Sequence, residues 1–134
     1  MTLQTRRSKI RYSDFKINFN IHPDQKDLSL STNEDSVKRS IKNLLFTSKG
    51  ERFFQPNLGA GLKAYLFENI SQTTASIIKR DIQNTIQNFE KRAKLINVRV
   101  TVLPDENAYA AEITFKTINR IEPVTLNTIL MRTR

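Results

Sequence analysis

The side chains of this sequence that could perform acid–base chemistry are glutamates, and the candidates are Glu51, Glu68, Glu90 and Glu112. Paired carboxyl groups carry out glycoside hydrolysis, which needs a carboxylic acid of raised pKa and a second carboxylate across a sugar-binding cleft. Glu51 and Glu90 each lie close in sequence to an arginine, and a neighbouring positive charge lowers the pKa of a carboxyl group. The chain also has no tryptophan to stack on a sugar. These residues argue against a glycosidase.

Other arrangements that carry chemistry are missing from the sequence. There is no cysteine, and the single histidine, His22, stands beside Pro23 with no second histidine to share a metal. No Ser/His/Asp set is present, and Gly50, Gly59 and Gly61 fit no phosphate-binding motif. We therefore expect no enzymatic activity, no cofactor and no metal.

The chain is strongly basic. Its 134 residues include 22 Lys and Arg against 13 Asp and Glu, a net charge of +9, which attracts nucleic acid, anionic membranes or acidic proteins. Arg6, Arg7, Lys9 and Arg11 could bind phosphates, but no zinc-finger, RNP-like or helix-turn-helix pattern accompanies them. Nucleic-acid binding is therefore an alternative that rests on charge alone. The longest apolar runs, such as residues 64–67, are too short to span a bilayer, so no membrane partner is expected.

The N-terminal part of the chain is predicted to hold an arm and a strand. Residues 1–13 show no sustained period and are predicted to form a flexible basic arm, followed by a single domain over residues 14–134. Strict alternation of apolar and polar residues from Phe15 to Ile21 predicts a half-buried strand that ends before Pro23.

The middle of the chain is predicted to form two helices, over about residues 34–47 and 73–93, because apolar residues recur there at helical spacing. The segment Gly50–Gly61 between them holds all three glycines, which predicts an ordered irregular loop. A short helix is expected from Leu62 to Glu68. Four large apolar residues of this region are expected to lie in the core: Phe53, Phe54, Leu58 and Phe67.

The C-terminal part is predicted to form three strands. Apolar residues alternate with polar ones from Ile96 to Val102, Pro104–Asn107 predicts a turn, and Tyr109–Ile118 completes a hairpin. Alternation from Val124 to Leu130 predicts a terminal edge strand. The sequence therefore predicts an α+β fold, a single domain whose mainly antiparallel sheet has two to three helices packed on one face.

The central block from Ser40 to Leu62, SIKNLLFTSKGERFFQPNLGAGL, is followed by Leu66-Phe67-Glu68-Asn69. This pattern closely resembles the small baseplate wedge family of contractile phages, over roughly residues 35–118. The resemblance implies a structural subunit of the virion's tail baseplate that joins the wedge core proteins and initiates the tail sheath. The family has carried the label lysozyme-like, so a muramidase remains an alternative beside nucleic-acid binding.

The resemblance also implies residues that contact the wedge core. The family often carries Glu-Pro-Arg at the end of the long helix, where this chain has Glu90-Lys91-Arg92, so Glu90 and Arg92 are expected to touch the wedge proteins. Without the proline the helix is expected to run on toward Lys94. On a continuing helix, residues two apart would not face each other, which leaves Glu90 and Arg92 available for other partners.

Arg52 is a further candidate for the wedge contact. It belongs to the turn Gly50-Glu51-Arg52 of the central block. The alternative is that Gly50 ends the first helix, while Glu51 and Arg52 pair with nearby charges and hold the loop.

For the sheath, the resemblance implies that the chain offers a sheet edge to the first sheath ring. An edge strand suits this role because its unpaired N–H and C=O groups template another chain. Val124, Leu126 and Leu130 would fix the strand to the core; the alternative is that the strand only completes the domain. The residues assigned to this contact are Val124, Thr125, Leu126, Asn127, Thr128, Ile129 and Leu130.

Overall fold

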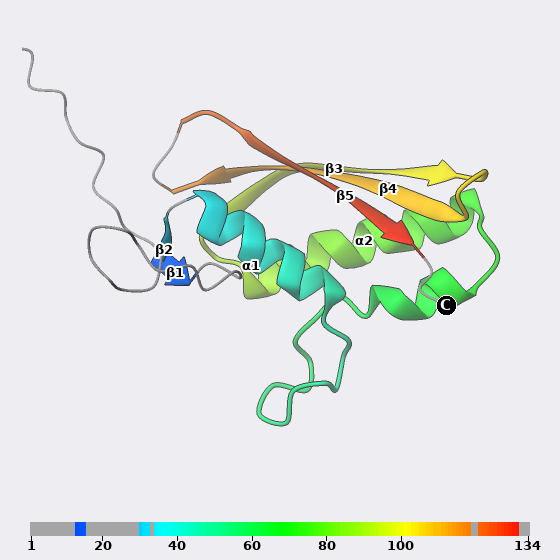
Figure 1. Ribbon diagram of the computed structural model, residues 1–134, viewed down its shortest axis with the longest axis horizontal. Helices are drawn as coiled ribbons and strands as arrows, with labels where there is room; N and C mark the ends of the chain where they lie inside the picture. The colour runs from blue at the N-terminus through cyan, green and yellow to red at the C-terminus, as the bar shows by residue number, and fades with distance from the viewer. Residues whose placement is uncertain (1–12, 16–29, 33, 119–120, 132–134) are drawn as a thin grey trace, which may run out of the picture.

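The computed structural model describes residues 13–15, 30–32, 34–118 and 121–131 (Figure 1). The elements are β1 (Ser13–Phe15), β2 (Leu30–Thr32), α1 (Glu34–Phe46), the 3-10 helix η1 (Leu62–Phe67), α2 (Gln72–Phe89), β3 (Ala93–Leu103), β4 (Ala108–Thr117) and β5 (Val124–Met131). Most of the predicted arm and of the predicted strand between residues 15 and 21 lies outside the described residues. Among the helices described, none has both the length and the apolar character needed to cross a membrane.

The predicted α+β class is confirmed. Strands β3, β4 and β5 form an antiparallel sheet in that order, and α1 and α2 lie on one of its faces (Figure 1). The short strands β1 and β2 pair separately with each other. Strand β5 is therefore an edge of the main sheet, as the alternation in its sequence predicted.

The core lies between the helices and the sheet. Apolar residues four apart place one stripe of each helix toward the sheet. The largest fully buried apolar side chains of this core are Val37, Ile41, Leu45, Ile78, Ile82, Ile86, Val98, Tyr109, Ile113, Phe115 and Leu130. Burying each large apolar side chain contributes about 2 kcal/mol to stability. Helix α2 begins at a cap, because the Thr74 amide donates to Ser71 Oγ at 3.1 Å.

The hairpin of β3 and β4 forms as predicted, and Asn107 closes its turn with a φ of 48°. One detail of the predicted alternation is wrong. The pairing register shifts between Leu95 and Asn97, and Ile96 is exposed rather than on the apolar face. A bulge inserts an extra residue into one strand and changes which side chains point inward, so the inward set resumes at Val98.

The loop between α1 and η1 departs most from the prediction. Phe53 and Phe54 are 99% and 100% exposed, and Phe67 is also exposed, so none of the three is a core residue; Leu58 is half-buried. The loop projects away from the helices and the sheet (Figure 1). Its backbone bonds mostly to itself, for example from Gly50 N to Pro56 O at 2.7 Å, so the tip lies beyond the reach of the core.

The loop returns against the last turn of α1, which requires a glycine. The Ala60 amide donates to Leu44 O at 3.2 Å, and the Gly61 amide donates to Thr47 O at 3.4 Å. Gly59 has a φ of 114°, and a Cβ placed on it would lie 2.3 Å from Thr47 O. A side chain here would collide with backbone and strain the chain.

We expect Gly59→Ala to lower the free energy of unfolding by roughly 2–4 kcal/mol, because steric overlap adds to the strain of the positive φ. Gly50→Ala is the matched control, since Gly50 has a φ of 84° but no atom within 4 Å of the added Cβ. It should cost only about 1–2 kcal/mol. Urea denaturation measures both variants, and equal losses would contradict this account of the close approach.

Candidate functional site

Helix α2 ends at Phe89 although no proline follows it. The Glu90 amide still donates to Ile86 O at 2.9 Å, and the Ala93 amide then donates to Glu90 O at 3.2 Å across a tight turn. The prediction that the helix runs on toward Lys94 is wrong. The reason is tertiary: Ala93 pairs with Thr117 at the start of β3, and an extended residue in a sheet cannot also continue a helix.

This turn brings Glu90 and Arg92 together. Arg92 Nε donates to Glu90 Oε1 at 2.7 Å, and Arg92 Nη2 donates to Glu90 Oε2 at 2.8 Å. The pair is bidentate, which is the strong geometry for an arginine and a carboxylate. The expectation that the two side chains would not face each other is therefore wrong, because it assumed a continuing helix.

The ion pair also connects α2 to α1. Arg92 Nη1 donates to Ser36 Oγ at 3.5 Å, and Ser40 hydrogen-bonds the Glu90 carboxylate. The sequence prediction overlooked both serines. Their signal was present, since Ser36 and Ser40 are four residues apart and border the apolar stripe that contains Val37 and Ile41, so they share one side of the helix.

Burial and charge compete at Glu90. The residue is 3% exposed, whereas the side chain of Arg92 is 31% exposed. Burial raises the pKa of the Glu90 carboxyl. The hydrogen bonds from Arg92 and Ser40 and the charge of Arg92 together lower this pKa by more than burial raises it, so it lies below its ordinary value of 4.5. Glu90 is thus ionised at neutral pH and is unsuited to donate a proton.

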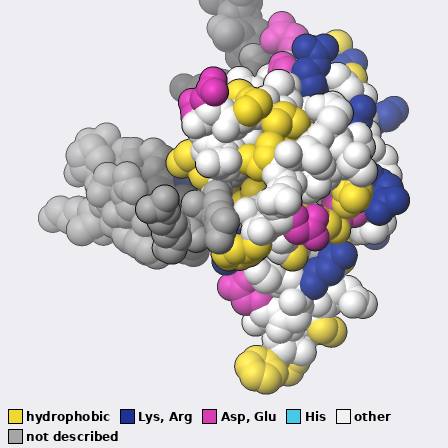
Figure 2. Space-filling view, turned by 90° about the vertical axis from the view of Figure 1, so that its right-hand side faces the viewer, with side chains coloured by type: hydrophobic (Ala, Val, Ile, Leu, Met, Phe, Trp, Pro, Cys, Tyr) yellow, Lys and Arg dark blue, Asp and Glu magenta, His cyan; other side chains and the backbone are white. Residues whose placement is uncertain are grey.

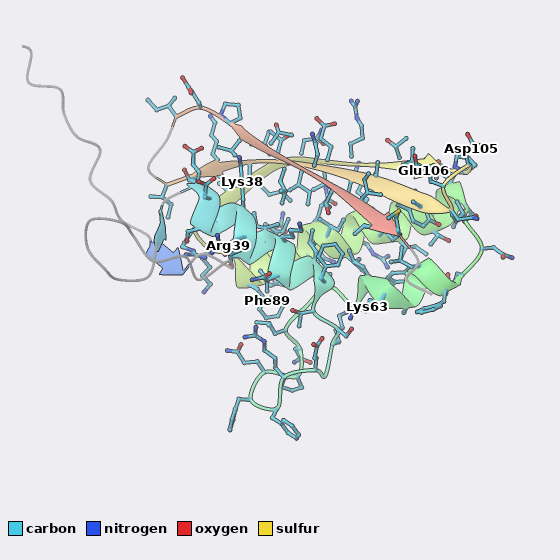
Figure 3. The ribbon with its side chains drawn as sticks, in the orientation of Figure 1. Lys38, Arg39, Lys63, Phe89, Asp105 and Glu106 are labelled. Atoms are coloured by element: carbon cyan, nitrogen blue, oxygen red, sulfur yellow. The ribbon has the colours of Figure 1, made fainter. Side chains whose placement is uncertain are left out.

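Arg52 lies near this pair. It lines a shallow hollow of about 230 Å³ together with Ser40 and Phe89, and Ser40 also bonds Glu90. Phe89 lies on the side of the helices from which the loop projects (Figure 3). Glu51 holds the loop through the backbone, since its Oε2 accepts from the Ser48 amide at 2.9 Å.

The four candidate carboxylates do not meet in a cleft. Glu51, Glu68 and Glu112 are exposed and lie on the loop, after η1 and on β4 respectively. The hollow beside Glu90 is lined by none of the other three glutamates. The arrangement that glycoside hydrolysis needs, two carboxyl groups across one cleft, is not formed by these residues.

The edge strand β5 is fixed by its inward side chains. Val124 and Leu130 are buried and Leu126 packs against the core, as predicted, whereas Thr125, Asn127 and Ile129 are exposed. In the part of the chain that the structure describes, β5 pairs with β4 alone. Its other edge is thus geometrically suited to accept a further strand.

Comparison with known protein families shows to which family the chain belongs. The family model described as "Baseplate wedge protein gp25" matches residues 31–123. The chain belongs to this family. It is therefore a component of a phage tail baseplate.

One curated relative agrees with this assignment, and two solved structures share the fold. The baseplate wedge protein gp25 of Enterobacteria phage T4 is 33% identical over 99 residues, which cover 74% of this chain and 75% of that protein. A Geobacter sulfurreducens protein described as a candidate tail lysozyme shares the fold with a TM-score of 0.68 and 24% identity, covering 79% of this chain and 96% of that one. A chain of the anti-feeding prophage baseplate matches with a TM-score of 0.60 and 21% identity, covering 92% of this chain and 87% of its own.

Glu90→Gln tests the ion pair, because it removes the charge and keeps the shape. We expect a loss of about 1–3 kcal/mol of stability at pH 7, since the variant leaves Arg92 without its charged partner. Because the folded pKa is depressed below 4.5, the pair stabilises the wild type above the unfolded pKa, and this contribution is lost as pH falls through the folded pKa.

Between pH 7 and pH 3, the free energy of unfolding measured with urea should therefore fall less for the variant than for the wild type. Glu68→Gln is the matched control, because Glu68 is exposed, and it should change stability by less than about 0.5 kcal/mol. If Glu90→Gln is as stable as the wild type at neutral pH, the ion pair contributes nothing to the stability of the fold.

Proposed function

We propose that this chain is a structural wedge subunit without catalytic turnover. It joins neighbouring wedge proteins at the end of α2 and offers the free edge of β5 to the first sheath ring. Membership of the gp25 family carries this proposal. The burial of Glu90 in an ion pair and the separation of the other glutamates support the absence of hydrolysis.

The wedge contact is assigned to Arg92 and Arg52, with Glu90 positioning Arg92. Glu90 holds the guanidinium in one orientation while 31% of the Arg92 side chain stays exposed. A preorganised donor loses less conformational freedom on binding. Arg52 is exposed beside the same region. The two arginines suit acidic or carbonyl-rich groups on a wedge core protein, and orphaning such an interfacial charge costs roughly 2–5 kcal/mol.

Glu90→Ala combined with Arg92→Ala tests this contact. The double change removes both halves of the pair, so no buried charge is left unpaired. We expect a folded protein that is lost from purified baseplates, as judged by circular dichroism and by mass spectrometry of the particles.

The matched control is Arg99→Ala with Glu112→Ala, since these exposed residues face each other on β3 and β4. This variant should be incorporated normally. Normal incorporation of the Glu90 and Arg92 variant would refute the wedge assignment.

The sheath contact is assigned to β5, with Val124, Leu126, Thr128 and Leu130 facing the core and Thr125, Asn127 and Ile129 facing outward. Main-chain groups at a free edge pair with an incoming strand, and the alternating side chains set its register. Deleting residues 124–134 would test this poorly, because it also removes Val124 and Leu130 from the core.

Two proline variants separate the edge from the core. Neighbouring residues of an antiparallel strand direct their N–H groups to opposite sides, so one of Asn127→Pro and Thr128→Pro breaks a bond to β4 and the other blocks only the free edge. We expect the variant that keeps wild-type stability to enter baseplates but to start no sheath, as seen by electron microscopy.

The corresponding pair on β3, Arg99→Pro and Val100→Pro, is the control for the opposite edge of the sheet. Of these two variants, the one that keeps wild-type stability should support full-length sheath. A stable β5 proline variant that also supports full-length sheath would refute the role of this strand.

The muramidase alternative receives less support. The Geobacter likeness concerns the fold, and the glutamates here do not share a cleft. The basic residues Arg6, Arg7, Lys9 and Arg11, on which nucleic-acid binding would rest, lie outside the described residues.

A further inference from the structure

The loop of residues 48–58 carries the most exposed large apolar side chains in the described part of the chain, Phe53 and Phe54 at 99% and 100%. They are adjacent in sequence in the middle of the loop, and Figure 2 shows hydrophobic side chains at the lowest point of the molecule. Two adjacent phenylalanines held fully in water are unfavourable for an isolated protein. Such a feature points to a binding partner.

The loop presents these rings on a preformed turn. The Gln55 amide donates to Arg52 O at 3.2 Å, so Phe53 and Phe54 are the two central residues of a β-turn. The Leu58 amide donates to Gln55 O at 3.1 Å, and Gly50 bonds Pro56 at the base. Little backbone entropy remains to be lost on binding, which favours affinity.

We propose that Phe53 and Phe54 form a two-ring plug that inserts into an apolar pocket of a neighbouring, different baseplate protein. The inference deepens the proposed role as a wedge subunit and rests on it. Arg52 precedes the two phenylalanines and also lines the hollow with Ser40 and Phe89. A protein bound at the end of α2 would therefore also contact the loop. Lys49 and Arg52, on either side of Glu51, suit a pocket with an acidic rim.

The surface around the loop argues against a second copy that presents this same face as the partner. A second hollow that Phe89 also lines, of about 280 Å³, is lined largely by polar side chains, among them Lys49, Asn57, Asn84 and Asn88. A second copy that presents this same face offers no apolar socket for the rings. Buried aromatic anchors of this kind carry a large share of the binding energy at protein interfaces.

A competition experiment tests the plug. Cells that produce the complete tail express the wild-type chain and a Phe53→Ser, Phe54→Ser variant in equal amounts, and mass spectrometry measures their ratio in purified baseplates. We expect the wild type to exceed the variant by about tenfold or more. Both proteins should unfold at the same urea midpoint, because the rings touch no core residue. A ratio near one overturns the proposal.

Ile121→Ser is the matched control, because Ile121 is 89% exposed and the segment before β5 lies on the side of the sheet away from the loop (Figure 1). It should compete equally with the wild type. If the wild-type chain itself is missing from purified baseplates, the proposed function fails and the plug with it. If the wild type is present and the double variant competes equally, the plug alone fails.

Photo-crosslinking identifies the partner. Phe54 is replaced by p-benzoylphenylalanine, and assembled baseplates are irradiated. The plug predicts a crosslink to another baseplate protein at a peptide rich in apolar residues. A crosslink only to a second copy of this chain, or to no protein, overturns the proposal.

Discussion

The pairing of β3 with β4 is the constraint that determines where the chain leaves α2. Because Ala93 is held opposite Thr117, the chain must leave α2 at Glu90 and turn within three residues. That turn places Glu90 and Arg92 face to face and directs them toward α1. A buried carboxylate is tolerated only when it is paired. The ion pair therefore stabilises the turn between α2 and β3.

The candidate contacts lie at three places in the described structure, and the hollow lined by Ser40, Arg52 and Phe89 joins two of them. The Glu90 and Arg92 pair lies where α2 meets β3, the free edge of β5 borders the sheet, and the loop with Phe53 and Phe54 projects from the opposite side of the helices (Figure 1). An enzyme gathers its functional groups around one cleft. The proposed connection to several neighbours is compatible with candidate residues that lie on separate elements.

The fold is shared with a protein described as a candidate tail lysozyme, and a shared architecture by itself does not establish a shared activity. The relevant carboxyl groups in this chain are either exposed on separate elements or, at Glu90, kept ionised by arginine. A general acid needs the opposite environment, in which burial dominates and raises the pKa. The electrostatics of Glu90 therefore serve structure and orientation.

The sequence by itself determined the class of the fold, the two helices, the hairpin and the edge strand, because each depends on local periodicity and on turn residues such as Pro104 and Gly59. It also determined the family through the block around Gly50 and Pro56. Only the tertiary structure decided where α2 ends, that Glu90 and Arg92 pair, and that Phe53 and Phe54 face solvent. The end of a helix against a strand, an ion pair across a turn and the direction of a loop tip are set by contacts between distant residues, which local periodicity does not record.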